Sequence, residues 1–193
     1  MLGSVMSAMG FSLAGGTALA LYFGHRRSVD LDWFTQKSIG DVLTLAGDLQ
    51  QRGVPLVVRR TAHGTLHGSV LSVHTLMFEY PYPLLKPALR LKPFGCQVAS
   101  LDDIACMKLS AVAQRGSKKD FVDIVMLLQH RASLRRLLTL YSRKYSISDT
   151  LHVLNALVYF DDAEREPMPR MLRDLDWRTV KRRLRLAVAD LAG

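Results

Sequence analysis

The sequence predicts an α+β fold, with strands and helices in the N-terminal half and helices alone in the C-terminal half. Short apolar or alternating runs typical of strands occur between glycine turns up to about residue 80. Prolines then interrupt the chain as far as residue 94, and from residue 100 onward the pattern becomes helical. These observations place a boundary near residue 98, between an α/β core over residues 1–98 and a helical lobe over residues 99–193.

The first two predicted elements are a buried strand and a short helix, joined by a glycine turn. Residues 11–14 form an apolar run that stops at Gly15 and Gly16, which is typical of a buried strand ending in a tight turn. Thr17 can then cap a helix over residues 18–23, a stretch of good helix formers. The glycines therefore lie between the end of a strand and the start of a helix.

A second strand, a second helix and three further strands complete the predicted core. In residues 29–34, apolar side chains on one face alternate with two acids on the other, which is the period-two pattern of a strand. Ser38 is the predicted cap of a helix that continues to about residue 52 and stops at Gly53. The three further strands are separated by turn signals and cover residues 55–61, 65–70 and 73–80.

The C-terminal half is predicted to be helical from Ser100 onward. Ser100 and Asp103 form a start similar to a capping box, with Asp in place of the usual Glu or Gln, for a helix that continues to about residue 113. The remaining predicted helices cover residues 118–129, 133–144, 148–162 and 177–191.

The composition indicates a folded protein with a polyanionic partner. The chain has 193 residues, of which 49% are hydrophobic and 22% charged, so a disordered or collagen-like chain is excluded. Its net charge of +9 favours nucleic acid, a nucleotide or an acidic protein as the partner. The arginines and lysines that could follow a phosphate backbone, unless they only form a solvated helix face, are Arg170, Arg173, Arg178, Lys181, Arg182, Arg183 and Arg185.

Cysteine usage and hydropathy predict a soluble protein of the cytoplasm. Cys96 and Cys106 are too few for a disulfide scaffold or a zinc ribbon and fit reduced packing residues. The sequence has no run of about 18 apolar residues, and its N-terminus lacks the positive charge with which a signal peptide begins. We therefore expect no membrane partner.

The acids of the second predicted strand are candidate metal ligands. Asp30 and Asp32 are two residues apart on a strand, so both project from the same face. Two carboxylates that converge in this way repel one another unless a cation offsets them. Mg²⁺ commonly uses one or two carboxylates together with substrate phosphates. A solvated edge face is the alternative interpretation.

The glycine turn before these acids is a candidate phosphate site. Gly15, Gly16 and Thr17 open a helix whose first N–H groups are unpaired, and glycine allows a phosphate to approach the backbone closely. A plain turn is the alternative. A phosphate site beside a metal-binding pair is what the transfer of a nucleotidyl group needs.

A basic segment lies between the predicted helix and the acidic strand. It includes Arg26 and Ser28, within residues 25–28. Its arginines either pair with Asp30 or Asp32 in a structural turn or help to bind phosphate.

A second group of candidate residues lies on the C-terminal helices. Lys108 and Arg115 are seven residues apart on one helical face, and Asp120 and Asp123 share a face of the next helix. A lysine aimed at a triphosphate adds positive charge where phosphate charge builds up, and an aspartate from another helix can fix that lysine or complete a metal site. Surface ion pairs are the alternative.

Glu79 is the candidate for a third metal-binding carboxylate. Its strand could run beside the strand of Asp30 and Asp32. The alternation assigns Glu79 to the side of Met77, so a solvated glutamate at a strand end is the alternative.

The two groups of residues together resemble the AbiEii/AbiGii toxin family. Residues 13–21 and 24–35 are similar to the first motif of that family, and residues 101–108 and 115–123 to its second motif block, in the same order and spacing. Residues 80–85 also resemble the family. The resemblance implies the nucleotidyltransferase superfamily and its DNA polymerase β-like fold, a mixed sheet with flanking helices.

The resemblance also implies an activity and partners. Members of the family carry out Mg²⁺-dependent transfer of a nucleotide from an NTP to an acceptor, and relatives act as toxins of toxin–antitoxin systems, some of them on tRNA 3′ ends. The partners expected from it are an NTP substrate, an RNA acceptor and a cognate antitoxin. Nucleotide or RNA binding by the same fold, with little or no catalysis, is the alternative function.

Roles for single residues follow from the motifs of the family. Gly16 and Thr17 would hold phosphates, and Asp30 and Asp32 would bind the metal. The second block would supply the remaining roles: triphosphate contact by Lys108, completion of the site by Asp120, and helix packing by Asp123. The third acidic position expected of the superfamily is occupied by Leu76 or Met77, with only Glu79 nearby.

Overall fold

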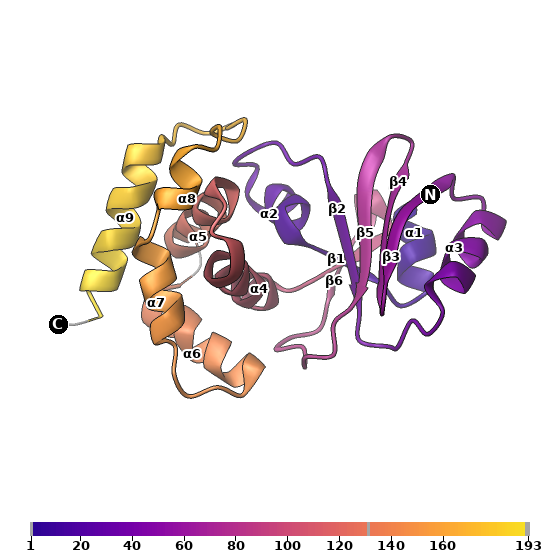
Figure 1. The fold of residues 1–193 in the computed structure, drawn as a ribbon, viewed down its shortest axis with the longest axis horizontal. Helices are drawn as coiled ribbons and strands as arrows, with labels where there is room; N and C mark the ends of the chain where they lie inside the picture. The colour runs from indigo at the N-terminus through magenta and orange to yellow at the C-terminus, as the bar shows by residue number, and fades with distance from the viewer. Residues whose placement is uncertain (1, 131, 192–193) are drawn as a thin grey trace. The chain divides into compact units, whose positions relative to one another are not determined.

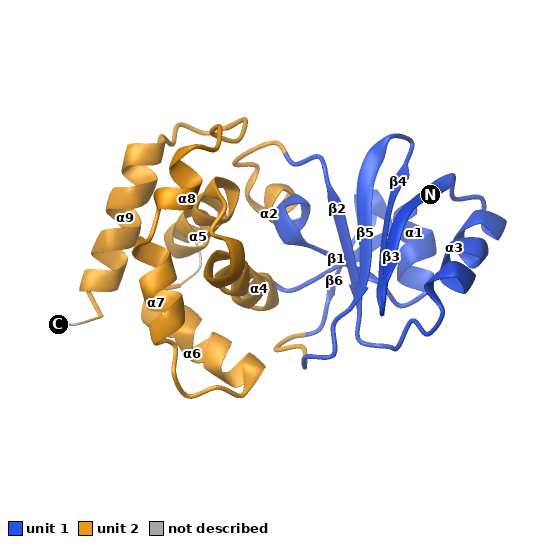
Figure 2. Cartoon of the chain, in the orientation of Figure 1, with its two compact units in different colours: residues 1–18, 28–83, 87–100 blue, residues 19–27, 84–86, 101–193 orange. Residues whose placement is uncertain are grey.

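The computed structural model describes residues 2–130 and 132–191, which fall into two compact units (Figure 2). Unit 1 consists of residues 1–18, 28–83 and 87–100, and unit 2 of residues 19–27, 84–86 and 101–193. The chain leaves unit 1 for the last time at Ser100 and enters unit 2 at Leu101, close to the boundary near residue 98 that the sequence suggests. Two short segments from the predicted core belong to unit 2, because tertiary contacts rather than order along the chain define a compact unit.

Unit 1 is built on a mixed sheet of seven strands in the order β3-β4-β5-β2-β1-β7-β6. The pairs β1–β7 and β2–β5 are parallel, and the other neighbours are antiparallel. The strands are β1 Ser12–Ala14, β2 Leu31–Thr35, β3 Leu56–Ala62, β4 Thr65–Val70, β5 Val73–Glu79, β6 Leu89–Leu91 and β7 Cys96–Val98 (Figure 1). The predicted α+β fold with a mixed sheet is confirmed.

The two faces of this sheet differ in chemistry. Helices α1 (Leu2–Ala8) and α3 (Val42–Gln51) lie on the same side of the sheet (Figure 1). Trp33, Leu66 and Met77 are paired across neighbouring strands and are at most 2% exposed, so they mark the core face. The residues that alternate with them point to the opposite face, which carries the polar side chains described below.

Some elements differ from their sequence predictions. Helix α1 and the strands β6 and β7 were not predicted, and β6 lies in the stretch that prolines interrupt. Helix α3 begins at Val42 with Asp41 as its cap, whose carboxylate accepts a hydrogen bond from the Leu43 N–H. The predicted cap at Ser38 is wrong, because the Ser38 hydroxyl donates to Glu79 instead.

The turn between β4 and β5 has an uncommon backbone. Leu71 and Ser72 both have positive φ, 48° and 67°, in a two-residue hairpin turn that usually contains Asn or Gly. Leu71 is 79% exposed. A branched side chain in the left-handed region costs about 1–2 kcal/mol of conformational free energy. Leu71 therefore destabilises this turn by about that amount.

Unit 2 is helical and is centred on α4 and α5. Helix α4 packs against α5, α6 and α7, and α9 packs against α5 and α7. The helices are α4 Leu101–Arg115, α5 Lys118–His130, α6 Leu134–Tyr145, α7 Leu151–Val158, α8 Asp161–Glu164 and α9 Trp177–Ala189. A single predicted helix over residues 148–162 is therefore two helices, α7 and α8.

The central position of α5 explains its composition. Its residues from Asp120 to Leu127 are all buried, so this helix has no solvated face over two turns.

None of the helices in the described part of the chain is long and apolar enough to cross a membrane.

Candidate active site

Asp30 and Asp32 lie together on the polar face of the sheet in unit 1. Asp32 is paired with Ala14 on β1 and with Leu76 on β5. Asp30 precedes β2, and its Oδ1 lies 3.8 Å from Nδ1 of His74 on β5, with 40% of the Asp30 side chain exposed. Both carboxylates are thus held by the sheet but remain accessible to a ligand.

The turn after β1 brings backbone close to the Asp32 carboxylate. Gly15 has a φ of +66° and begins α2 (Gly15–Phe23), directly after Ala14. A Cβ atom at Gly15 would collide with the Asp32 carboxylate, so no other residue fits here without displacing that group. The start of α2, with the unpaired N–H groups of its first turn, therefore adjoins the acidic pair.

Thr17 connects this turn to the acidic strand. Its hydroxyl donates to the backbone carbonyl of Asp30, and its oxygen lies 2.9 Å from the hydroxyl oxygen of Ser28. The structure therefore brings together Gly15, Thr17, Ser28, Asp30 and Asp32. These contacts fix the first turn of α2 relative to both carboxylates.

Glu79 is not brought together with the acidic pair. It is paired with Thr35, at the far end of β5 from His74. Its Oε1 accepts hydrogen bonds from the Ile39 N–H at 2.7 Å and the Ser38 hydroxyl at 3.1 Å, and the first of these lowers the pKa of Glu79 below its usual value. The residue beside Asp32 on β5 is Leu76, in agreement with the departure from the superfamily pattern noted in the sequence.

The donor set in unit 1 suits Mg²⁺ with an incomplete protein shell. The carboxylates of Asp30 and Asp32 are hard oxygen ligands, and the backbone at Gly15 lies directly against the Asp32 carboxylate. No group of three or more His, Cys, Asp or Glu side chains within residues 2–130 and 132–191 could hold a metal ion. The chain therefore fits a magnesium ion that takes further ligands from water and from nucleotide phosphates.

Unit 2 contains a buried network of charged side chains centred on Asp123. The Lys108 Nζ lies 2.7 Å from Asp123 Oδ2 and 2.8 Å from Asp120 Oδ1. Arg26 donates from Nε and Nη2 to the two oxygens of Asp123, at 2.7 and 2.8 Å, and His25 Nε2 lies 2.9 Å from Oδ1. Asp123 therefore supports helix packing, as expected from the sequence.

This network gives Arg26 a partner that the sequence did not indicate. Its guanidinium is only 4% exposed and forms a bidentate pair with Asp123. The segment around it is also fixed by the backbone, since the Arg27 N–H donates to the Arg170 carbonyl. Phosphate binding by Arg26 stays a prediction that would require breaking this buried pair.

The buried charges hold one another in their ionised forms. Burial alone would lower the pKa of Lys108, but the carboxylates of Asp123 and Asp120 outweigh it and raise that pKa. Burial would raise the pKa of Asp120, but Lys108 and Arg115 outweigh it and lower the pKa to about 2. The pKa of Asp123 is lowered further, mainly by Lys108 and Arg26 against the effect of burial.

Arg115 connects this network to the surface. Its guanidinium is bound to Asp120 at 2.9 and 3.2 Å, while 58% of its side chain remains exposed. The Ser117 hydroxyl also donates to Asp120, at 2.7 Å. Arg115, Ser117 and Lys119 line a cavity of about 450 Å³ in unit 2. Arg115 thus lies between the buried network and this cavity.

Acid should destabilise the protein through Asp120. The pKa of Asp120 is about 2 in the folded chain and near 3.8 otherwise, so the unfolded chain binds this proton more tightly. The stabilisation, roughly 2 kcal/mol, is complete above about pH 4 and is lost as the pH falls towards 2. We expect the urea midpoint to fall over this window in the wild-type chain. It should fall less steeply in Asp120→Asn, and identical slopes for the two proteins would contradict this assignment.

Two features of the sites were not predicted from the sequence. His74 was not considered, although its position two residues before Leu76 places it level with Asp30 once β2 and β5 are known to be parallel. A buried pair between Lys144 Nζ and Asp103 Oδ1, at 2.7 Å, was also missed. Asp103 further accepts from the Leu85 and Lys86 N–H groups, so it fixes the short segment 84–86 to α4.

Comparisons with known proteins found a matching family model and a related protein. A family model described as the nucleotidyl transferase AbiEii toxin, type IV TA system, matches residues 69–191. An uncharacterized protein of Aquifex aeolicus (strain VF5) is 38% identical over 158 residues, which make up 81% of this chain and 76% of that protein.

Two solved structures share the fold. MenT4, a nucleotidyltransferase toxin from Mycobacterium tuberculosis H37Rv, has a TM-score of 0.68 and 15% identity, over 100% of this chain and 80% of that one. A protein from H. pylori described as a nucleotidyltransferase has a TM-score of 0.53 and 18% identity, over 94% of this chain and 88% of that one.

Proposed function

The chain belongs to the AbiEii family of nucleotidyl transferase toxins, and on that premise we propose that it transfers a nucleoside monophosphate from an NTP to RNA with the help of Mg²⁺. The enzyme class, a nucleotidyltransferase, follows from the family. Three elements of this function are our proposal: the metal, the acceptor, and the residues that perform the reaction. The observation that carries them is the accessible pair Asp30–Asp32 beside the glycine turn at the start of α2.

In the proposed reaction, residues of unit 1 bind and orient the NTP. Gly15 and Gly16 expose the first N–H groups of α2 to its phosphates, and Thr17 holds this turn against the strand of Asp30. Asp30 and Asp32 would hold the metal ion. When bound, Mg²⁺ neutralises phosphate charge and orients an in-line attack on the α-phosphorus. Catalysis then consists mainly of positioning and electrostatics.

The roles proposed for unit 2 concern phosphate charge. The exposed guanidinium of Arg115, kept in place by Asp120, is suited to contact phosphate oxygens. Contact between Lys108 and a triphosphate stays a prediction, and it requires the ammonium group to leave at least one of its two carboxylates.

RNA is the proposed acceptor because of the charge of the chain and of α9. The net charge is +9, and Arg178, Arg182 and Arg185 are exposed along one face of α9. A cognate antitoxin is the proposed protein partner, on the basis of the family description.

Incubation with each labelled NTP, Mg²⁺ and total cellular RNA tests the proposed function. We expect label from one or more NTPs to appear in RNA, and EDTA in excess over Mg²⁺ to stop the transfer. Separation of RNA from protein after the reaction identifies the acceptor class. Label found only in protein would contradict RNA as the acceptor, and transfer at an unchanged rate in EDTA would contradict the role of the metal.

A further inference from the structure

We propose that a hollow over β3, β4 and β5 binds the terminal nucleotide of the acceptor RNA strand; this inference rests on the proposed function and specifies where the acceptor lies. The hollow has a volume of about 530 Å³, which lies within the range of small-molecule sites. It is contained entirely in unit 1. Its lining includes His74, the neighbour of Asp30.

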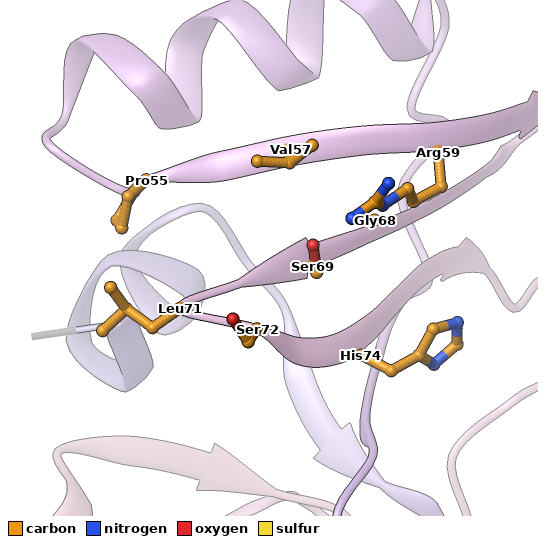
Figure 3. Close-up of a pocket in the computed structure, with 8 residues that line it drawn as sticks. All are labelled: Pro55, Val57, Arg59, Gly68, Ser69, Leu71, Ser72 and His74. Carbon is orange, nitrogen blue, oxygen red and sulfur yellow. The ribbon is translucent and has the colours of Figure 1, made fainter.

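The lining of the hollow has an apolar end and a polar end (Figure 3). Pro55 and Leu71 lie at one end, and Arg59 and His74 at the other, with the hydroxyls of Ser69 and Ser72 between them. A nucleotide has the matching division, since a base packs on apolar surface and a phosphate pairs with a guanidinium. The polar end is the end nearer to Asp30, because His74 contacts that residue.

A β-bulge brings Arg59 to this face of the sheet. The register between β3 and β4 shifts between Val58 and Arg60, so Arg59 is an additional residue opposite β4. Across the strands, Gly68 leaves no room for a Cβ, which would lie 2.7 Å from the Val57 carbonyl oxygen. Close approach of the two strands and the bulge together therefore set the position of the Arg59 side chain.

Arg59 differs from the other arginines at the two sites in having no internal partner. Within residues 2–130 and 132–191, no hydrogen bond, ion pair or ring contact involves its guanidinium. By contrast, Arg26 and Arg115 are paired with buried aspartates, and Arg60 lies 3.4 Å from His67. A guanidinium without a protein partner beside a hollow is available for an anionic ligand.

The order of the strands favours the acceptor over the NTP as the occupant. Strand β2, with Asp32, lies between β1, which leads into the glycine turn, and β5, which borders the hollow. An in-line displacement places the attacking oxygen and the leaving pyrophosphate on opposite sides of the α-phosphorus. If the NTP phosphates occupy the turn on the β1 side, the attacking hydroxyl approaches from the β5 side, where the hollow lies.

Acceptor binding by Arg59→Gln tests the inference. We expect this variant to raise the KM for RNA about tenfold or more, because a charge-assisted contact is lost, while kcat and the KM for NTP change less than about twofold. Leu71→Asn should raise the KM for RNA a few-fold without harming the fold, since asparagine tolerates the left-handed backbone at this turn. Arg52→Gln is the matched control, because it removes the same charge from the exposed end of α3.

A second measurement separates this inference from the proposed reaction. Fluorescence anisotropy of a 5′-labelled single-stranded RNA oligonucleotide, without NTP, reports binding alone. Weaker binding by Arg59→Gln than by Arg52→Gln supports the hollow even if no label transfer is found. Equal RNA affinity of the two variants and the wild type, or no RNA binding at all, overturns the inference and leaves any observed nucleotidyl transfer to RNA or protein intact.

Discussion

Asp30→Asn is expected to reduce nucleotidyl transfer by about a thousandfold or more, because the amide is neutral and a poor ligand for Mg²⁺. The side chain keeps its size, and the carbonyl of residue 30 can still accept from Thr17. We therefore expect the variant to retain its fold and its thermal unfolding midpoint. The rate is measured as label transferred from NTP per unit time under saturating Mg²⁺.

A control and an independent readout make this expectation decisive. Asp48→Asn changes an exposed carboxylate on α3 and should leave the rate within about twofold of wild type. Titration with Mn²⁺, followed by electron paramagnetic resonance, should show weaker metal binding in Asp30→Asn only. Full activity of Asp30→Asn would remove this pair from the mechanism.

Asp123→Ala is expected to lower the free energy of unfolding by about 3–5 kcal/mol. The substitution leaves Arg26 without its bidentate partner and removes one of the two carboxylates bound to Lys108, in a region where both cations are at most 5% exposed. Buried cations that lose their counter-charge cost several kcal/mol, which is more than the pair contributes when intact. Urea denaturation followed by far-UV circular dichroism measures the change.

Two further variants show whether charge or volume causes this loss. Asp174→Ala removes an exposed carboxylate of unit 2 and should change the free energy of unfolding by less than about 0.5 kcal/mol. Asp123→Asn keeps the volume but not the charge and should still be strongly destabilised. An Asp123→Ala protein as stable as Asp174→Ala would show that the network makes no net contribution.

The acidic pair and the glycine turn could be predicted because their pattern is local. The alternation of residues 29–34 and the Gly-Gly-Thr turn each extend over only a few residues. The alternation indicates a strand, and the glycines indicate a tight turn. Gly15 and Asp32 then meet through the antiparallel pairing of β1 with β2, in which Ala14 lies opposite Asp32. Long amphipathic helices such as α6 and α9 were also predicted within a few residues.

The pairing of Asp123 with His25 and Arg26 could not be predicted, because these two residues come from a distant part of the chain. Arg26 precedes Asp123 by 97 residues, and no spacing rule connects them. The same limit applies to His74, which reaches Asp30 only through the parallel pairing of β2 and β5. Glu79 shows the converse: its residue type fits a metal site, but the register of β5 places it beside Thr35 and the loop at residues 38–39.

The interleaved path of the chain has a consequence for its synthesis. The polypeptide alternates between the two units in six successive segments, so neither unit is a continuous fragment. On the ribosome, His25 and Arg26 emerge long before Asp123, so they can form these buried contacts only after α5 has been synthesised. A nascent chain that ends before α5 therefore leaves these two side chains without the carboxylate that they bind in the folded protein.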